Sequence, residues 1–149
     1  MTWFSITISL ANMLPYCVTI ATMASPEAPL AFVNFNFVSQ TKYSVKESLG
    51  KDCRFLQGPE TKPEHRARFR EALENGEACI SDITNYKKDG QQFPCRLHLQ
   101  PVYGKQQQSK PVFYIGLQTD MSNVTLVNGN NVVLEPLLEF FAANNNSNT

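Results

Sequence analysis

The second half of the chain alternates apolar and polar residues in a way that predicts three consecutive β-strands. We expect these strands at residues 78–86, 92–102 and 112–120. A tight turn ending at Gly90, which supplies a positive φ, separates the first two, and a polar loop at 103–110 separates the last two. Because hairpins join these strands, neighbouring strands should pair antiparallel.

The first half mixes short strands with short helices. β-Branched residues at 16–23 and an apolar run at 30–34 predict two more strands. Residues 36–44 predict a short helix, which a turn at 45–49 follows. The segment 50–58, bounded by glycines, indicates a loop or a short helix.

A longer helix is expected after residue 60. Thr61 and Glu64 have the spacing of a capping box, and Pro63 suits the first turn. The apolar spacing then continues to Asn75-Gly76, where the helix should end. Together these elements predict an α+β fold, with short helices on one face of a five-stranded antiparallel sheet.

The two ends differ from this central region. Residues 1–15 predict a helical flanking segment, and residues 16–121 form the predicted core. The extension 122–149 is rich in asparagine, with a short amphipathic helix expected at 132–142 and a frayed end after it.

Composition narrows the functional classes. The chain of 149 residues has 13 basic and 13 acidic residues, and this zero net charge argues against non-specific binding of nucleic acid. None of its 7 glycines forms a phosphate-binding GxGxxG or GxxxxGK[ST] loop. No segment has the ~18 consecutive apolar residues of a membrane span, so we expect no membrane insertion.

The four cysteines do not form a metal or disulfide pattern. Cys17, Cys53, Cys79 and Cys95 have neither CxxC spacing nor the density of a disulfide framework, and there are only two histidines. The sequence therefore predicts no metal site. Free thiols indicate a reducing compartment, and we expect a cytoplasmic protein.

Cys53 has two interpretations from its neighbours alone. Lys51 and Arg54 could lower the pKa of its thiol and make it a nucleophile, or it could be an ordinary surface thiol. No histidine is placed as a base in the pattern of a cysteine hydrolase. A turnover enzyme is therefore not expected.

Two amides fall on strand faces that should be buried. Alternation places Asn85 with Ile83, and Gln118 with Tyr114 and Gly116. A buried amide needs a hydrogen-bond partner. Two of them indicate a ligand with a polar edge between the sheet and the helices, with Gly116 leaving space for it.

The segment Gly50–Gly58 (GKDCRFLQG) resembles the GxNCRFLQG signature of LOV domains, the blue-light-sensing flavin branch of the PAS superfamily. Four further stretches match in order across 16–121. They are LAFVNFNFVSQTKYS at 30–44, FREA at 69–72, NYKKDG at 85–90 and YIGLQTD at 114–120. The resemblance implies the PAS fold and a bound flavin.

The resemblance also implies the roles of individual residues. Cys53 would bond reversibly to the flavin C4a carbon after blue-light excitation, and Gln118 would be the switch that reorients when flavin N5 is protonated. Arg54 and Arg70 would bind the phosphate, and Gln57 the ribityl–phosphate region. The ring's polar edge would meet Asn85 and Gln118. The apolar pocket walls would be Leu56, Phe69, Leu97 and Leu99.

Two positions depart from the family pattern. Asp52 replaces the asparagine before the reactive cysteine, which adds a negative charge near the phosphate side of the site. Cys95 replaces an asparagine that would meet the ring's polar edge, and a thiol is a weaker hydrogen-bonding group. The segment between Gln57 and Glu64 is short, whereas FAD-binding members often carry an insertion there, so FMN is expected rather than FAD.

The sequence indicates a route for the signal but not its effector. Phe113, Ile115 and Leu117 form an apolar outer face that needs a cover. Residues 3–14, the 132–142 helix or a second subunit could supply it, so a homodimer through this face and the flanking helices is one expectation. The alternative functions are a flavin-binding redox sensor and a flavin-free PAS interaction module.

Overall fold

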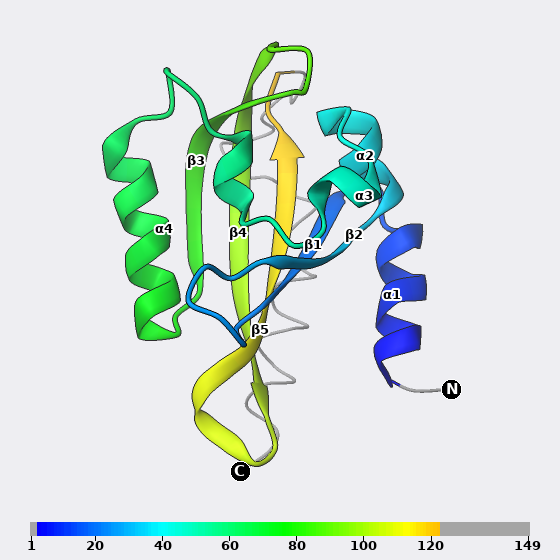
Figure 1. The fold of residues 1–149 in the computed structure, drawn as a ribbon, viewed down its shortest axis with the longest axis vertical. Coiled ribbons are helices and arrows are strands. Elements are labelled where there is room, and N and C mark those ends of the chain that lie inside the picture. The colour runs from blue at the N-terminus through cyan, green and yellow to red at the C-terminus, as the bar shows by residue number, and fades with distance from the viewer. Residues whose placement is uncertain (1–2, 123–149) are drawn as a thin grey trace, which may run out of the picture.

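The computed structural model describes residues 3–122 and contains one five-stranded antiparallel sheet, as predicted. The strands are β1 (Cys17–Thr22), β2 (Leu30–Val33), β3 (Cys79–Tyr86), β4 (Gln92–Gly104) and β5 (Gln107–Asp120). Their order across the sheet is β2-β1-β5-β4-β3, which places the last strand at the centre (Figure 1). The helix predicted at 132–142 lies outside the described residues.

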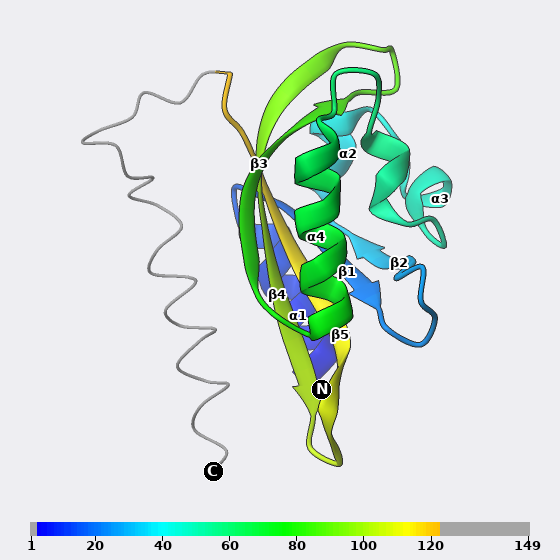
Figure 2. The ribbon, with the colours of Figure 1, turned by 90° about the vertical axis from the view of Figure 1, so that its left-hand side faces the viewer.

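The helices are α1 (Trp3–Met13), α2 (Phe35–Thr41), α3 (Val45–Ser48), the 3-10 helix η1 (Cys53–Leu56) and α4 (Pro63–Asn75). Figure 2 shows α2, α3 and α4 on the same side of the sheet. The α+β class and the short helices on one face are confirmed. No helix among the described residues is long and apolar enough to cross a membrane.

The inner face of the sheet is covered by two groups of side chains. Under α4, Phe69 and Ala72 pack against residues of β3 and β4. Beside η1 and α2, Leu56 and Phe37 pack against β1 and β2, and both are fully buried. The inner face of the central strand β5 therefore lies between these two groups of side chains.

Helix α1 covers part of the opposite face. Its Ala11 packs against Val18 and Leu117, with Ile115 at the margin. Asn34 holds this junction, because its side-chain amide donates to the carbonyls of Ala11 at 2.9 Å and Tyr16 at 2.7 Å. One of the covers expected from the sequence, residues 3–14, therefore does contact the outer face.

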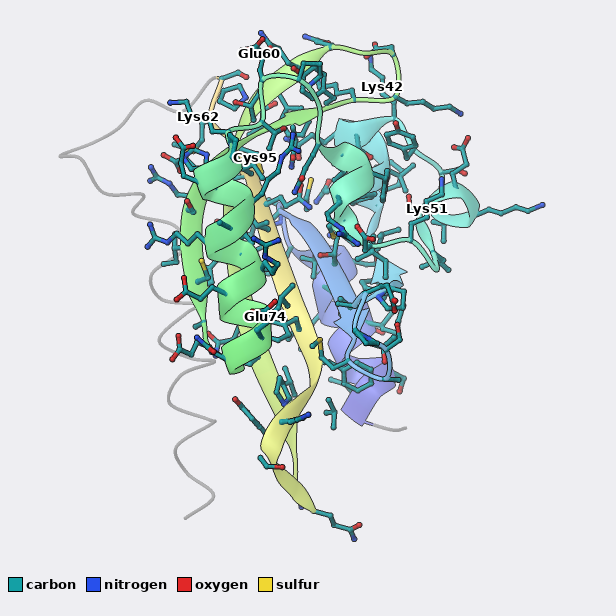
Figure 3. All side chains as sticks on the ribbon, turned by 60° about the vertical axis from the view of Figure 1, so that its left-hand side comes forward. Lys42, Lys51, Glu60, Lys62, Glu74 and Cys95 are labelled. Atoms are coloured by element: carbon teal, nitrogen blue, oxygen red, sulfur yellow. The ribbon has the colours of Figure 1, made fainter. Side chains whose placement is uncertain are left out.

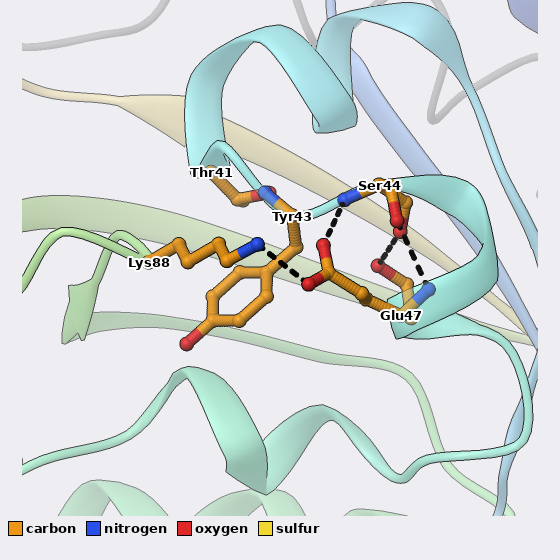
Figure 4. A network of polar contacts seen from close by, with 6 residues as sticks. Thr41, Tyr43, Ser44, Glu47 and Lys88 are labelled. Carbon is orange, nitrogen blue, oxygen red and sulfur yellow. Dashed lines mark hydrogen bonds and ion pairs between the residues drawn. The ribbon is translucent and has the colours of Figure 1, made fainter.

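Three local predictions were wrong. The turn expected at 45–49 is the helix α3, which the capping box between Ser44 and Glu47 begins (Figure 4). Glu47 also pairs with Lys88 of the β3–β4 turn, so this short helix is tied to the sheet. A four-residue helix has too few apolar positions for its period to be visible in the sequence.

The capping box predicted at Thr61 does not form. Helix α4 begins at Pro63 with Lys62 as N-cap and no side-chain cap. Instead, the Thr61 hydroxyl donates to the carbonyl of Thr84 at 2.6 Å and accepts from the backbone N–H of Gly58 at 3.0 Å. The Thr61 side chain therefore makes a long-range hydrogen bond to β3 instead of the helix cap that the local pattern predicted.

The polar loop predicted at 103–110 is mostly strand. β4 continues to Gly104 and β5 begins at Gln107, which leaves only a short turn between them. Most of this polar stretch belongs to the sheet because β4 and β5 continue to pair here, with Tyr103 opposite Pro111. At the other predicted turn, Gly90 has the expected positive φ of 86°.

Candidate functional site

The reactive-cysteine segment is anchored to the sheet edge by backbone hydrogen bonds. The Leu30 N–H donates to the carbonyl of Lys51 at 2.8 Å, and the Gly50 N–H donates to that of Leu30 at 2.9 Å. Asp52 then caps η1 by accepting from the backbone N–H of Arg54 at 2.8 Å. This arrangement orients Cys53, the first residue of η1, toward the apolar group around Leu56.

Cys53 is half-buried, and its environment disfavours the thiolate. Burial first, and then the negative charge of Asp52, raise the pKa of the thiol to about 12. The lowered pKa suggested by the neighbouring cations is therefore wrong, and the thiol is only partly exposed. The Arg54 guanidinium is directed to Asp52, so it does not stabilise the sulfur as an anion.

We expect alkylation of Cys53 in the dark to be slow at neutral pH and to rise as the pH approaches 12. At pH 8 a thiol of pKa 12 is about one part in 10,000 thiolate, against about one tenth for the ordinary value of 9. Mass-spectrometric rates of iodoacetamide labelling of Cys53, between pH 7 and pH 10, would check this in native protein. Labelling that levels off below pH 9 would contradict it.

Both predicted amides are buried on the inner face. Asn85 on β3 is 4% exposed and Gln118 on β5 is 2% exposed. The side chain of Asn85 makes no hydrogen bond with any residue that the structure describes. A buried amide of this kind fits a ligand that offers both donors and acceptors.

Cys95 lies between the two amides. On β4 it is paired with Ile83 of β3 in one direction and with Asp120 of β5 in the other. Its thiol donates only a long contact of 3.8 Å to the side-chain oxygen of Gln118. Figure 3 shows Cys95 in the layer beside α4, where burial raises the pKa of its thiol and keeps it neutral.

The predicted apolar walls come from three elements. Phe69 of α4 and Leu97 of β4 are buried in the same group, and Leu99 packs against that group. Leu56 of η1 is fully buried in the other group, next to Cys53. The structure therefore places walls on both sides of the strip of β5 that holds Gly116 and Gln118.

Gly116 provides close approach within this strip. A Cβ atom at this position would lie 2.5 Å from the Thr19 hydroxyl oxygen, and 3.6 Å and 3.8 Å from the side chains of Leu99 and Leu97. Thr19 is opposite Gly116 in the β1–β5 pairing. Because Gly116 has no side chain, other atoms can approach the backbone closely at the middle of the inner face.

Replacing Gly116 by alanine should lower the free energy of unfolding by about 1–3 kcal/mol, because the new methyl group overlaps the Thr19 hydroxyl. Adding Thr19→Ala should recover most of this loss. Urea unfolding of the wild type, both single variants and the double variant gives the coupling energy. Simple additivity of the two changes would contradict the predicted overlap.

The polar residues predicted to bind the phosphate differ in their contacts with the rest of the protein. Arg54 pairs with Asp52, whereas Arg70 is exposed on α4 and makes no ion pair with another described residue. Gln57 caps the end of η1 through its backbone N–H.

Cys17 and Gln40 lie near the site but were not predicted as site residues from the sequence. Cys17 is paired with Gln118 in the sheet, and its thiol donates to the side-chain oxygen of Gln40 on α2. The buried Gln40 amide nitrogen makes no hydrogen bond of ordinary geometry with a described residue, but the Gln40 side chain lies close enough to Asp120 to help lower the pKa of that carboxyl. Strand alternation along 17–21 could have placed Cys17 on the inner face, but only the sheet order places it beside Gln118.

Comparison with known proteins identifies a domain family. The PAS domain model matches residues 15–123. A blue-light-activated histidine kinase of Rhizobium johnstonii is 42% identical over 97 residues, which are 65% of this chain and 28% of the kinase. Phototropin-2 of Oryza sativa is 34% identical over 100 residues, 67% of this chain and 11% of that protein. The chain thus spans about a quarter, or less, of the length of these relatives.

Solved structures give the same result. The LOV domain of the Erythrobacter litoralis EL346 blue-light-activated histidine kinase is 35% identical with a TM-score of 0.67, over 72% of this chain and 97% of that one. The Rhodobacter sphaeroides LOV protein is 28% identical with a TM-score of 0.76, over 83% and 70%. The chain therefore belongs to the PAS domain family and, within it, to the LOV domains of blue-light photoreceptors.

Proposed function

We propose that this LOV domain binds FMN and senses blue light through Cys53. The observation that carries the proposal is the buried amide of Asn85 on the inner face of the sheet, which has no hydrogen-bond partner among the described residues. When bound and excited, the flavin supplies the C4a carbon to which the Cys53 sulfur bonds reversibly, while the thiol proton passes to flavin N5. The raised pKa of Cys53 supports this role, because it keeps that proton on the sulfur in the dark.

The remaining residues would bind and orient the chromophore. Asn85 and Gln118 would exchange hydrogen bonds with the polar edge of the ring, with Cys95 as a weaker neighbour. Arg70, Arg54 and Gln57 would hold the ribityl phosphate. The apolar walls would exclude water from the ring, and these are Leu56, Phe69, Leu97 and Leu99. The short connection between Gln57 and α4 supports FMN over FAD.

The signal would leave through the central strand. Gln118 and its neighbour Leu117 point to opposite faces of β5, and Leu117 packs against Ala11 of α1. A reorientation of the Gln118 amide would therefore change the packing of α1. Light can shift this packing only as far as the adduct favours one arrangement over the other. Dimerisation through the same outer face stays a prediction.

The absorption spectrum of purified protein, in the dark and directly after blue light, tests the proposal. We expect a structured flavin band that bleaches and then recovers. A flavin band that never bleaches would favour a redox sensor, and no band after reconstitution with FMN would favour an interaction module without chromophore. In each of these functions the domain would act as a sensor or binding module without catalytic turnover of its own.

A further inference from the structure

The hydrogen-bonding fork of Arg54 is occupied by a carboxylate of this chain. Arg54 Nε donates to one oxygen of Asp52 at 2.9 Å, and its Nη2 donates to the other at 2.8 Å. The first oxygen also accepts from the Arg54 backbone N–H at 2.8 Å. Asp52 is thus held by the start of η1 as well as by the guanidinium, although the Arg54 side chain is itself 71% exposed.

The charge of Arg54 is balanced before any ligand arrives. The pKa of Asp52 is lowered, chiefly by the hydrogen bond from Arg54, so this carboxylate is ionised at neutral pH. Glu27 is a second acid whose charge acts on Arg54. Arg70, by contrast, makes no ion pair with a described residue. Of the two arginines expected to share a phosphate, Arg54 is therefore already neutralised by the protein, and Arg70 is the one that keeps an unbalanced charge.

The binding of a phosphate gains little free energy from an arginine whose donors already bind a carboxylate. A guanidinium recognises phosphate through paired, charge-assisted hydrogen bonds, and here Asp52 already uses Nε and Nη2. A phosphate dianion must either displace the carboxylate or bind beside it against like-charge repulsion. The ribityl chain and the ring carry no such charge and are unaffected by the pair.

Resting on the proposed function, we propose that Asp52 is a specificity-determining residue that weakens the preference for a phosphorylated flavin, because it neutralises Arg54 and leaves the phosphate to Arg70. The domain then accepts riboflavin with nearly the affinity that it has for FMN. The wild-type dissociation constants for the two flavins should differ by less than about fivefold, which corresponds to about 1 kcal/mol. The affinity for FMN should also depend only modestly on salt, because Arg54 and Asp52 balance each other and Arg70 alone meets the phosphate with an unpaired charge.

The test uses Asp52→Asn, which removes the charge and keeps an oxygen that can cap η1. Flavin-free protein is titrated with FMN and with riboflavin, and binding is followed by flavin fluorescence polarisation. We expect the variant to bind FMN about tenfold more tightly, with riboflavin unchanged within about twofold. Asp82→Asn is the matched control, since Asp82 forms a similar two-bond pair with Arg96 on another part of the sheet.

A second comparison isolates Arg54. Arg54→Gln should weaken FMN binding only slightly in the wild type, but about tenfold in the Asp52→Asn background, where the guanidinium is released. A wild-type preference for FMN above about fivefold, or an Asp52→Asn ratio equal to that of the wild type, would overturn the inference alone. Failure of both flavins to bind would overturn the proposed function and this inference with it.

Discussion

Cys53→Ala is expected to abolish the light-induced bleach of the flavin band while flavin binding is retained. The substitution removes the sulfur that forms the bond, and the other thiols are placed differently. Cys95 lies on the sheet between the two amides, and Cys79 lies under α4. Illuminated protein should instead show sustained flavin fluorescence, because the excited state then has no thiol to react with.

The measurement is the absorption change before and after a blue-light pulse, with flavin content determined on the same sample. Cys95→Ala is the matched control, since it also removes a buried thiol close to Gln118. It should keep the bleach and its recovery. A bleach of ordinary size in Cys53→Ala would show that another residue reacts, and loss of the bleach in both variants would point to damage of the pocket.

Gln118→Leu should form the adduct but lose the light-induced change in α1. Leucine is close to glutamine in size and keeps the inner face filled, but it has no amide to reorient. The effect on α1 should be large, because Gln118 lies next to Leu117, one of the residues on which α1 packs. We expect the light–dark difference in amide hydrogen exchange of residues 5–14 to fall below about a tenth of the wild-type difference.

Gln92→Leu provides the control for this experiment. Gln92 is exposed at the start of β4, so the same chemical change there should leave the exchange difference intact. A full light-induced change at α1 in Gln118→Leu, with normal adduct formation, would contradict the proposed route. The signal would then have to leave through another element that touches the pocket, such as η1 or α4.

Much of the site followed from the sequence because strand geometry is strictly periodic. Side chains alternate between the faces of a strand, so the apolar neighbours of Asn85 and Gln118 predicted that both amides are buried. The motif around Cys53 identified the family, and the comparisons confirmed it. The five strands, their antiparallel pairing and the class of fold were all predictable from local patterns and short hairpins.

Features that depend on distant contacts were not predictable in this way. Thr61 has the local pattern of a helix cap, but the carbonyl of Thr84, 23 residues away in the chain, holds its hydroxyl. The pairing of Cys17 with Gln118 depends on the strand order, which no local period encodes. Helix α3 is likewise held in part by Lys88 from a remote turn.

The electrostatics of the site likewise depend partly on the local sequence and partly on contacts that only the fold creates. By itself the sequence determined which ionisable residues lie near Cys53, since neighbours along the chain are always close. The tertiary structure decided how they act, because burial raises the pKa of the thiol and the guanidinium of Arg54 turns to Asp52 instead of the sulfur. Desolvation and hydrogen-bond direction depend on surrounding atoms from several elements, and only the folded chain brings those atoms together.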